Sequence, residues 1–397
     1  MRVSHVITRL ILGGAQENTV DSVIGLNRYD EWEVELIAGP TRGPEGTLEF
    51  RFNEANPALQ ICPRLVRPIS PINDALACRD LIHRWRASNP HIIHTHSGKA
   101  GALGRLAARV AGVPIVIHTI HGPSFGPFQG RLANLLFRKV ERWVGGMTTH
   151  FVSVAQSLTD RYLDAGIGRP EQYTCIHSGF DVEAFCGVRP EADARLKLGL
   201  RPEDFLIGCL GRLVPLKGQD DLVASAAEIL KACPRAKFIL MGDGLMRREL
   251  ERRIHKAGLT DRFRLVGLVP SEEVPHYLKL LDVLVHLSRR EGLARALPQA
   301  LACGIPVIAY DCDAASEVCQ DGETGFLIAP GDLSSLPVKL QQLAMDPALG
   351  TRFGRAGREL VRREFTVEKM IVSLHQLYLR AASEAGLSGP RAEEGRQ

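Results

Sequence analysis

Short apolar runs alternate with amphipathic segments along most of the chain, and the alternation occurs twice. The apolar runs lie at 3–8, 33–39, 91–96, 115–120, 150–154 and 173–179 in the first half, and at 205–211, 236–242, 263–267, 282–287, 306–310 and 325–329 in the second. Helix-like stretches of about 10–15 residues separate most of them. Continuous apolar strands that alternate with helices are typical of parallel βαβ units. The pattern therefore predicts an α/β fold with two doubly wound, Rossmann-like domains.

The boundary between the two halves falls where turn residues and charges cluster, at 180–204. A length of 397 residues also exceeds that of one ordinary domain. We place a first domain at 1–187, a second at 188–365 and a disordered polar tail at 384–397. Ligands of open α/β sheets bind at the carboxyl ends of the strands. We therefore expect the two domains to face a central cleft lined by the loops that follow strands.

Composition narrows the class of protein. Apolar residues make up 45% and charged residues 24%, which is typical of a soluble globular protein, and a net charge of +4 does not indicate a nucleic-acid partner. The nine cysteines are scattered without a C-x-x-C pair, which indicates reduced thiols. We expect no signal peptide and no transmembrane helix, because no apolar stretch is long enough. These features predict a cytoplasmic protein.

Two loops of the first half follow predicted strands and carry candidate ligand contacts. In LGGAQ, Gly13 and Gly14 allow backbone amides to approach an anion or a sugar at a helix start, although a tight turn without a ligand has the same pattern. In HTIHG, His121 can bind a sugar hydroxyl or serve a structural role. The absence of G-x-G-x-x-G argues against an NAD-dependent oxidoreductase.

Two loops of the second half have similar positions. GRLVPLKG places Arg212 and Lys217 on either side of a proline-containing turn. An arginine fork and a lysine point charge suit a diphosphate, and a solvated basic turn is the alternative. In MGDG, Gly242 permits the close approach of a nucleotide or forms only a turn.

The block REGLARALPQALACGIPV is the most specific pattern. Proline is tolerated only in the first turn of a helix, so Pro298 predicts a helix that begins at 294–297. The preceding residues, Gly292 to Ala296, then offer free amides at a positive helix end, which suits a phosphate leaving group. Glu291 can accept sugar hydroxyls or cap the helix, and Gln299 can bind ribose hydroxyls.

Two further patterns resemble metal sites. His94 and His96 have the spacing of ligands on a strand, and Asp311 and Asp313 form a D-x-D sequence. Neither pair has an evident further ligand, so we expect structural roles for the histidines and loop or capping roles for the aspartates. The sequence predicts no metal site and no cofactor.

These motifs, in this order over residues 1–380, resemble those of retaining glycosyltransferases of family 4, which have the GT-B fold. The resemblance implies a helix at 366–383 that crosses back to the first domain. It implies that His121 contacts the donor sugar, that Arg212 and Lys217 neutralise the leaving diphosphate and that Glu291 holds the transferred sugar. The implied donor-binding residues are Gly13, Gly14, Gly242, Leu268 (through its backbone, to the base), Gly292, Leu293, Ala294 and Gln299.

The chain departs from the family pattern at one of these positions. The family carries E-x7-E, and Gln299 stands where the second glutamate binds the ribose. An amide still donates and accepts hydrogen bonds, but a charged role is excluded. The resemblance implies metal-independent, mainly electrostatic catalysis without a protein nucleophile.

Residues 130–146 interleave leucines and a tryptophan with basic side chains, which predicts an amphipathic helix. This helix lies within residues 51–150, which carry 13 basic and four acidic side chains. It either buries its apolar face in the domain or contacts anionic lipid, where a lipid-linked acceptor would lie. Peripheral attachment to the inner face of the cytoplasmic membrane therefore remains an alternative.

The motifs together predict a hexosyltransferase that moves a sugar from a nucleotide-sugar, most simply a UDP-sugar, to a glycan or lipid-linked acceptor. Such enzymes serve the biosynthesis of cell-surface polysaccharide or lipopolysaccharide. Two alternatives remain open, a GT-B-like epimerase of UDP-sugars and a non-catalytic nucleotide-sugar-binding protein. The sequence does not identify the sugar, the base or the acceptor.

Overall fold

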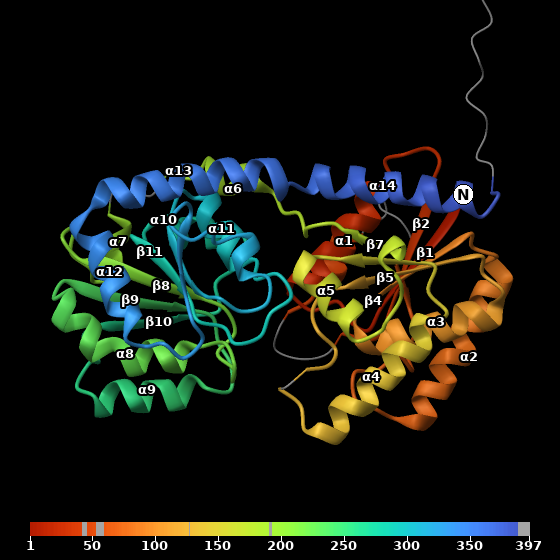
Figure 1. Cartoon of the computed structure of the whole chain (residues 1–397), viewed down its shortest axis with the longest axis horizontal. Coiled ribbons are helices and arrows are strands. Elements are labelled where there is room, and N and C mark those ends of the chain that lie inside the picture. The colour runs from red at the N-terminus through yellow and green to blue at the C-terminus, as the bar shows by residue number, and fades with distance from the viewer. Residues whose placement is uncertain (42–45, 53–58, 127, 190–192, 388–397) are drawn as a thin grey trace, which may run out of the picture. The chain divides into compact units, whose positions relative to one another are not determined.

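The computed structural model describes residues 1–397 except 42–45, 53–58, 127, 190–192 and 388–397. The chain forms two compact units, residues 1–179 with 367–397 and residues 180–366. Each unit has its own parallel sheet (Figure 1). The boundary at which the chain first passes from the first unit to the second lies between residues 179 and 180, eight residues before the boundary that we predicted at 187/188. The reason is that helix α6 (Val182–Cys186) packs against α11 (Ala296–Ala302) and α13 (Pro347–Glu364) of the second unit.

The first unit contains a seven-stranded sheet in the order β3-β2-β1-β4-β5-β6-β7, and all its strands are parallel. The strands are β1 (Arg2–Ile7), β2 (Glu33–Ala38), β3 (Leu59–Ile61), β4 (Ile92–His96), β5 (Ile115–Ile120), β6 (His150–Ser153) and β7 (Tyr173–Cys175). The helices are α1 (Gly14–Leu26), α2 (Pro71–Ser88), α3 (Gly98–Ala111), α4 (Arg131–Gly145), α5 (Gln156–Asp164) and α14 (Val367–Glu384), with short 3₁₀ turns at Glu49–Arg51 and Pro170–Gln172.

The second unit contains a six-stranded parallel sheet in the order β10-β9-β8-β11-β12-β13. Its strands are β8 (Phe205–Leu210), β9 (Ala236–Met241), β10 (Phe263–Gly267), β11 (Val283–His286), β12 (Val307–Tyr310) and β13 (Gly325–Ile328). The helices not yet given are α7 (Ala194–Lys197), α8 (Gln219–Ala232), α9 (Arg247–Lys256), α10 (Val274–Lys279) and α12 (Ser335–Met345), with a 3₁₀ turn at Ala315–Glu317.

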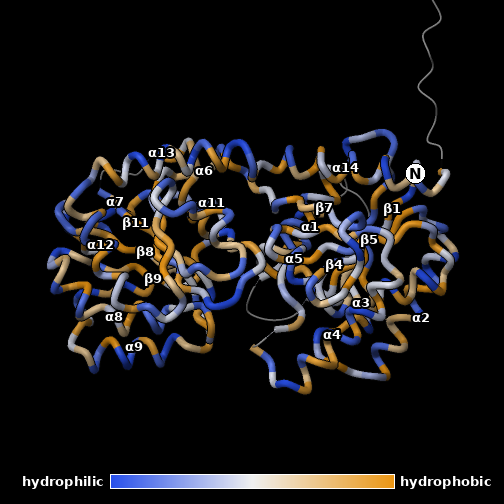
Figure 2. Tube along the Cα trace, viewed as in Figure 1, coloured by the Kyte–Doolittle hydropathy of each residue, from blue (hydrophilic) through white to orange (hydrophobic). Residues whose placement is uncertain are grey.

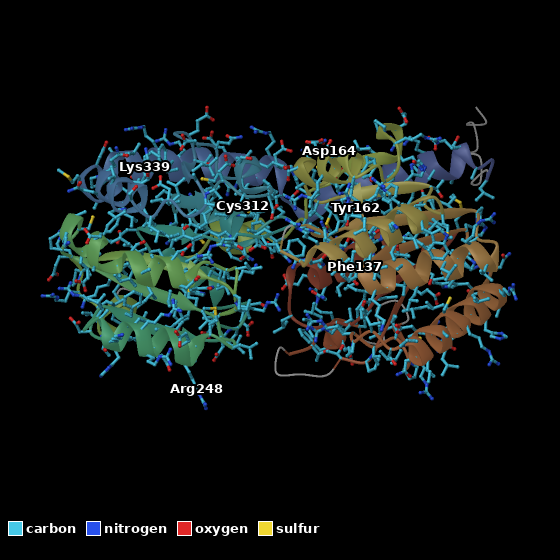
Figure 3. All side chains as sticks on the ribbon, turned by 60° about the horizontal axis from the view of Figure 1, so that its bottom comes forward. Phe137, Tyr162, Asp164, Arg248, Cys312 and Lys339 are labelled. Atoms are coloured by element: carbon cyan, nitrogen blue, oxygen red, sulfur yellow. The ribbon has the colours of Figure 1, made fainter. Side chains whose placement is uncertain are left out.

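The predicted α/β architecture is confirmed, because every predicted apolar run contains a strand. The pattern missed β3, a three-residue edge strand. The apolar strands are buried because helices cover parallel sheets on both faces. The covering helices are amphipathic, and Figure 2 shows hydrophobic and hydrophilic residues alternating along α9. This helix buries Leu250 and Ile254, whereas its Arg248 extends away from the ribbon (Figure 3).

Helix α14 belongs to the core of the first unit. Its residues Met370, Ile371, Leu374 and Tyr378 are buried together with side chains of α1. The ordered chain continues past the predicted start of the tail at 384, since the Leu387 amide donates to the Ala382 carbonyl at 2.9 Å. The rest of that tail, 388–397, lies outside the described residues.

Two further predictions concern the whole chain. All nine cysteines are free thiols, as the scattered spacing predicted. Among the helices that the structure describes, none combines the length and the apolar character that crossing a membrane requires.

Candidate functional site

Three loops at the carboxyl ends of β8, β9 and β11 are joined through their backbones. The Gly211 amide donates to the Met241 carbonyl at 2.9 Å, and the Leu213 amide donates to the Asp243 carbonyl at 2.9 Å. The Arg289 amide donates to the Leu216 carbonyl at 2.8 Å. The predicted loops therefore form one continuous surface at one edge of the second sheet.

Two glycines make this close packing possible. Gly218 has φ +79°, and a Cβ at this position would lie 2.0 Å from the Leu287 carbonyl oxygen. Gly242 has φ +131°, and its Cβ would lie 2.1 Å from the carbonyl oxygen of Gly211. We predicted that Gly242 either admits a nucleotide or forms only a turn. In the structure the loop that contains Gly211 packs against the Cα atom of Gly242, and a larger side chain would clash with it.

Replacing Gly218 by alanine should therefore be costly. An alanine in the left-handed backbone conformation lowers the free energy of unfolding by about 1–2 kcal/mol. The clash with Leu287 lowers it further, by about 1–3 kcal/mol, the usual cost of overpacking. Gly258 is the matched control, since it has φ +70° but no atom within 4 Å of its Cβ position. Thermal unfolding should show a clearly larger loss for Gly218→Ala than for Gly258→Ala. Equal losses would contradict the steric reason.

Glu291 is the centre of a polar cluster on this surface. Its carboxylate contacts the Lys217 ammonium, and the His286 Nε2 atom lies 3.3 Å from the carboxylate oxygen Oε1. Its amide donates to the Asp313 carboxylate at 2.6 Å. Asp313 adopts φ +53°, a conformation that aspartate tolerates better than most residues. Asp313 of the D-x-D sequence thus braces the loop, which is the kind of role that we predicted for it.

The surroundings of Glu291 hold it in the charged form. Burial raises the pKa of this carboxyl, but the neighbouring His286 and the positive charge of Lys217 outweigh burial and lower the pKa to about 2. Glu291 is therefore a carboxylate at neutral pH and accepts hydrogen bonds only. Lys217 has three donors, so one can serve Glu291 while the others remain available for a ligand.

Arg212 begins the same loop and differs from Lys217. Its side chain is exposed, and its guanidinium makes no hydrogen bond or ion pair with any described residue. The loop thus presents one cation fixed by a carboxylate and one that is free to bind an anion.

The loop that follows β11 also offers amides. Helix α11 begins at Ala296, as Pro298 predicted. The amides of Gly292, Leu293 and Ala294 make no hydrogen bond within the described part of the chain, although all three residues are buried. Backbone amides at the start of a helix have no partner within the helix, so an anionic ligand would satisfy them.

The other predicted donor-site residues are less informative. Gln299 lies half-buried on α11, and its side-chain amide bonds to none of the described residues. Leu268 follows β10, and its side chain is 64% exposed. Gly13 precedes α1 with φ 170°, an extended conformation that does not demand glycine, and Gly14 is the first residue of α1.

His121 lies directly after β5 in the first unit. Burial lowers its pKa to about 3, so the ring is neutral at physiological pH. Its Nε2 atom lies 3.0 Å from Nδ1 of His96. His121, Gly13 and Gly14 thus belong to the first unit, whereas Arg212, Lys217 and Glu291 belong to the second, in which Lys217 contacts Glu291.

Sequence reasoning missed His286. It is the last residue of β11, and a lone polar side chain at the carboxyl end of the apolar run DVLVHL was the available signal. A residue in this position is directed to the ligand edge of a parallel sheet.

Comparison with known proteins adds to this picture. The family described as Glycosyltransferase Family 4 matches residues 12–184, and Glycosyl transferases group 1 matches residues 191–360. The chain is 32% identical over 308 residues to 2-deoxystreptamine glucosyltransferase of Streptomyces kanamyceticus, covering 73% of this chain and 76% of the relative. It is 27% identical over 387 residues to an Escherichia coli protein named UDP-Gal:alpha-D-GlcNAc-diphosphoundecaprenol alpha-1,3-galactosyltransferase, covering 96% of this chain and 97% of the relative.

A solved structure shares the fold. HepE of Anabaena, in complex with UDP and glucose, matches with a TM-score of 0.81 and 22% identity, covering 96% of this chain and 100% of HepE. Two Rossmann-like units and this likeness define the GT-B fold. The chain belongs to glycosyltransferase family 4.

Proposed function

We propose that the protein transfers a sugar, with retention of configuration and without a metal ion, from a UDP-sugar to a glycan or lipid-linked acceptor of cell-surface polysaccharide or lipopolysaccharide synthesis. The observation that carries this proposal is the charged Glu291–Lys217 pair beside the unpaired amides of 292–294. A carboxylate that can accept hydrogen bonds from sugar hydroxyls and a set of amides that can bind an anion thus lie next to each other on one loop. The UDP-sugar named for the Escherichia coli relative and the UDP bound to HepE support this choice of donor.

Each group has a role that follows from its chemistry. Glu291 accepts the hydroxyls of the transferred sugar, and His121 contacts the donor sugar. Arg212, Lys217 and the loop amides stabilise the negative charge that develops on the leaving diphosphate. Gln299 binds ribose, and the backbone of Leu268 meets the base.

The proposed reaction needs no protein nucleophile. The bond between the anomeric carbon and the diphosphate oxygen breaks, and a bond from the acceptor hydroxyl oxygen forms on the same face. The hydroxyl proton passes to the leaving phosphate oxygen. The protein contributes orientation and charge stabilisation, and it keeps water from the reacting atoms.

A panel of UDP-, GDP- and ADP-sugars tests the donor. A ligand at about 100 times its Kd adds about 2.7 kcal/mol of stability, which corresponds to a rise of about 5–10 °C in the unfolding midpoint of units of this size. We expect this rise with UDP-sugars and with UDP. Stabilisation by GDP- or ADP-sugars alone would overturn the choice of UDP.

Release of UDP separates the candidate activities. A transferase should release UDP slowly from its own donor. An epimerase would alter the sugar without net transfer, and a non-catalytic binding protein would be stabilised by the donor without any turnover. Either of these two results would overturn the proposed transfer.

Helix α4 supports the proposed contact with a membrane. Leu132, Leu136 and Trp143 are 84%, 60% and 58% exposed, and Lys139 is exposed among them. The buried residues of α4 are Glu141, Val144 and Gly145. The helix therefore does not bury its leucine-rich face within its own unit, which was the alternative. We propose that this apolar and cationic face binds the anionic membrane surface that carries the acceptor.

Sedimentation with vesicles tests this contact. At low salt the protein should sediment with anionic vesicles much more than with neutral ones. The double change Leu132→Glu with Leu136→Glu should weaken the binding about tenfold or more, because it removes apolar area that the membrane would bury and adds negative charge. Met345→Glu is the control, since Met345 is 77% exposed on α12. Equally poor binding to neutral and anionic vesicles would contradict the proposal.

A further inference from the structure

An unbroken chain of hydrogen bonds crosses the interior of the first unit and ends at His121. It links six side chains in the order Thr119, His94, Tyr378, His5, His96 and His121. They come from β5, β4, α14, β1, β4 again and the loop after β5. Among the described residues, His121 makes a hydrogen bond only with His96, through Nε2. The series of hydrogen bonds therefore ends at the His121 Nδ1 atom, which can bind a ligand.

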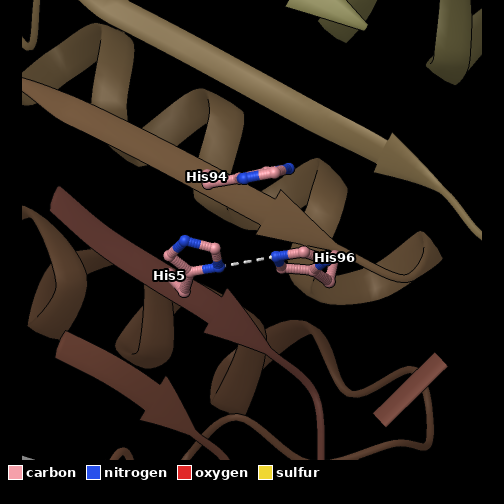
Figure 4. Close-up of side chains that lie close together, drawn as sticks. All are labelled: His5, His94 and His96. Carbon is pink, nitrogen blue, oxygen red and sulfur yellow. Dashed lines mark hydrogen bonds between the residues drawn. The ribbon is translucent and has the colours of Figure 1, made fainter. Parts of the chain in front are cut away.

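The sheet topology brings the three central imidazoles together. His5 and His94 are register partners on the adjacent strands β1 and β4. His94 and His96 are two residues apart on β4 and therefore lie on the same face. Figure 4 shows the three rings side by side, with the hydrogen bond of 2.9 Å between His5 Nδ1 and His96 Nε2. Tyr378 of α14 covers this face and bonds to His5 Nε2 at 2.9 Å and to His94 Nδ1 at 2.5 Å.

The rings of the chain are neutral. Burial lowers the pKa of His5 to about 3 and lowers the pKa values of His94 and His96 well below the usual value. A neutral imidazole has one N–H donor and one lone pair. Because both nitrogens of His5, His94 and His96 are engaged, each ring must donate to one neighbour and accept from the other. All the hydrogen bonds of the chain therefore point in the same direction.

Thr119 decides which direction this is. Its hydroxyl is buried, and His94 Nε2, at 2.6 Å, is its one hydrogen-bond partner among the described residues. If His94 donated to this hydroxyl, the hydroxyl hydrogen would have no acceptor, at a cost of about 1–3 kcal/mol. Thr119 therefore donates, and the direction carries through Tyr378 to His96 and on to His121.

We propose that Thr119, Tyr378 and His5 are positioning residues that hold His121 in its Nδ1–H tautomer and so present a hydrogen-bond donor to an oxygen atom of the donor sugar. The proposal rests on the proposed contact of His121 with that sugar. It makes a specific statement about four rings, because the same direction requires His94, His5, His96 and His121 all to carry their proton on Nδ1. In water the Nε2–H form of histidine prevails, so four Nδ1–H rings are a distinctive signature.

The tautomers can be read without any substrate. In long-range ¹H–¹⁵N spectra of the full-length protein labelled with ¹⁵N-histidine, His5, His94, His96 and His121 should all be neutral Nδ1–H rings, and His121→Gln assigns the terminal one. Thr119→Val removes the hydroxyl at similar volume. Without this donor the hydrogen bonds can reverse their direction, and Nε2–H rings should appear. Tyr378→Phe removes the hydroxyl that donates to His5, so His5, His96 and His121 should no longer be held in the Nδ1–H tautomer. Tyr310→Phe is the control, since its buried hydroxyl bonds to Asp221 at 2.7 Å in the second unit, and it should leave the four signals unchanged.

Activity provides the second reading. Partners that orient a metal-bound histidine typically contribute about 10–100-fold. By the same orienting effect, Thr119→Val and Tyr378→Phe should each lower kcat/KM for UDP release by about this factor. In a His121→Ala background the same changes should have little further effect, because their target is absent. Additive losses would indicate a merely structural role and overturn the proposal.

Two other results would also overturn it. One is an Nε2–H tautomer at His121 in the unaltered protein. The other is a stoichiometric metal ion in the purified protein that His5→Gln removes, since nitrogens of His5, His94 and His96 lie within 4.8 Å of one another and could instead hold a metal. A protein that shows the four Nδ1–H rings but releases no UDP would refute the proposed function and leave the tautomer assignment standing.

Discussion

Replacing Lys217 by methionine or Glu291 by glutamine should lower the rate of UDP release by about 10²–10³-fold, the loss usually seen when one group that stabilises transition-state charge is removed. Both side chains are only about one-fifth exposed, at 22% and 17%. Lys217→Met removes a cation from the leaving diphosphate and leaves the carboxylate with His286 alone. Glu291→Gln removes the charged acceptor of the sugar hydroxyls.

A matched control exists in the same unit. Lys231 and Glu228 form an exposed pair at 2.7 Å on α8. Lys231→Met and Glu228→Gln make the same chemical changes outside the site and should leave the rate within twofold. If UDP release were unchanged in both Lys217→Met and Glu291→Gln, the site assignment would be wrong.

The same pair defines a dependence on pH. The pKa of Glu291 lies below its usual value of 4.5, at about 2. The stabilisation that comes from its ionised form is therefore fully present above pH 4.5 and is lost only as the pH falls through about 2. The profile of kcat/KM should thus show no fall from Glu291 between pH 8 and 5. In Lys217→Met the pKa should rise, and an acid limb should move toward pH 5.

Replacing Glu141 by glutamine should lower the free energy of unfolding of the first unit by about 3–5 kcal/mol, the usual cost of breaking a buried ion pair. The Glu141 carboxylate lies 2.8 Å from the Arg105 guanidinium, and the two side chains are 5% and 0% exposed. Arg105 also donates to the Gly101 carbonyl at 2.9 Å, so its charge is held deep between α3 and α4. Removing the carboxylate leaves this charge buried without a counter-charge.

Tryptophan fluorescence makes the measurement specific to one unit, because Trp32, Trp85 and Trp143 all belong to the first unit. Urea unfolding followed at these residues should show the loss. Asp80→Asn is the control, since Asp80 pairs with Arg84 at 3.2 Å with partly exposed side chains and should cost less than about 1 kcal/mol. The double change Arg105→Met with Glu141→Leu should recover much of the stability. A loss from Glu141→Gln no larger than the control would refute the role of the buried pair.

The sequence by itself determined the fold class and predicted which loops carry the candidate site. Continuous apolar runs predicted both parallel sheets, because strands covered on two faces must be apolar throughout. Pro298 predicted where α11 begins, since proline cannot occupy a helix interior. Lys217 and Glu291 were found separately, because each follows a strand and the carboxyl ends of parallel strands share one edge.

Only the tertiary structure decided which of these residues meet and which faces are covered. The contact of Lys217 with Glu291 joins residues 74 positions apart and depends on β8 lying next to β11. The outward direction of the leucines of α4 depends on what packs behind the helix, which an amphipathic pattern does not reveal. The chain from Thr119 to His121 needs β1 beside β4 and α14 across them. Local pattern reports whether a residue prefers burial, whereas partners are chosen by strand order and by the return of a distant helix.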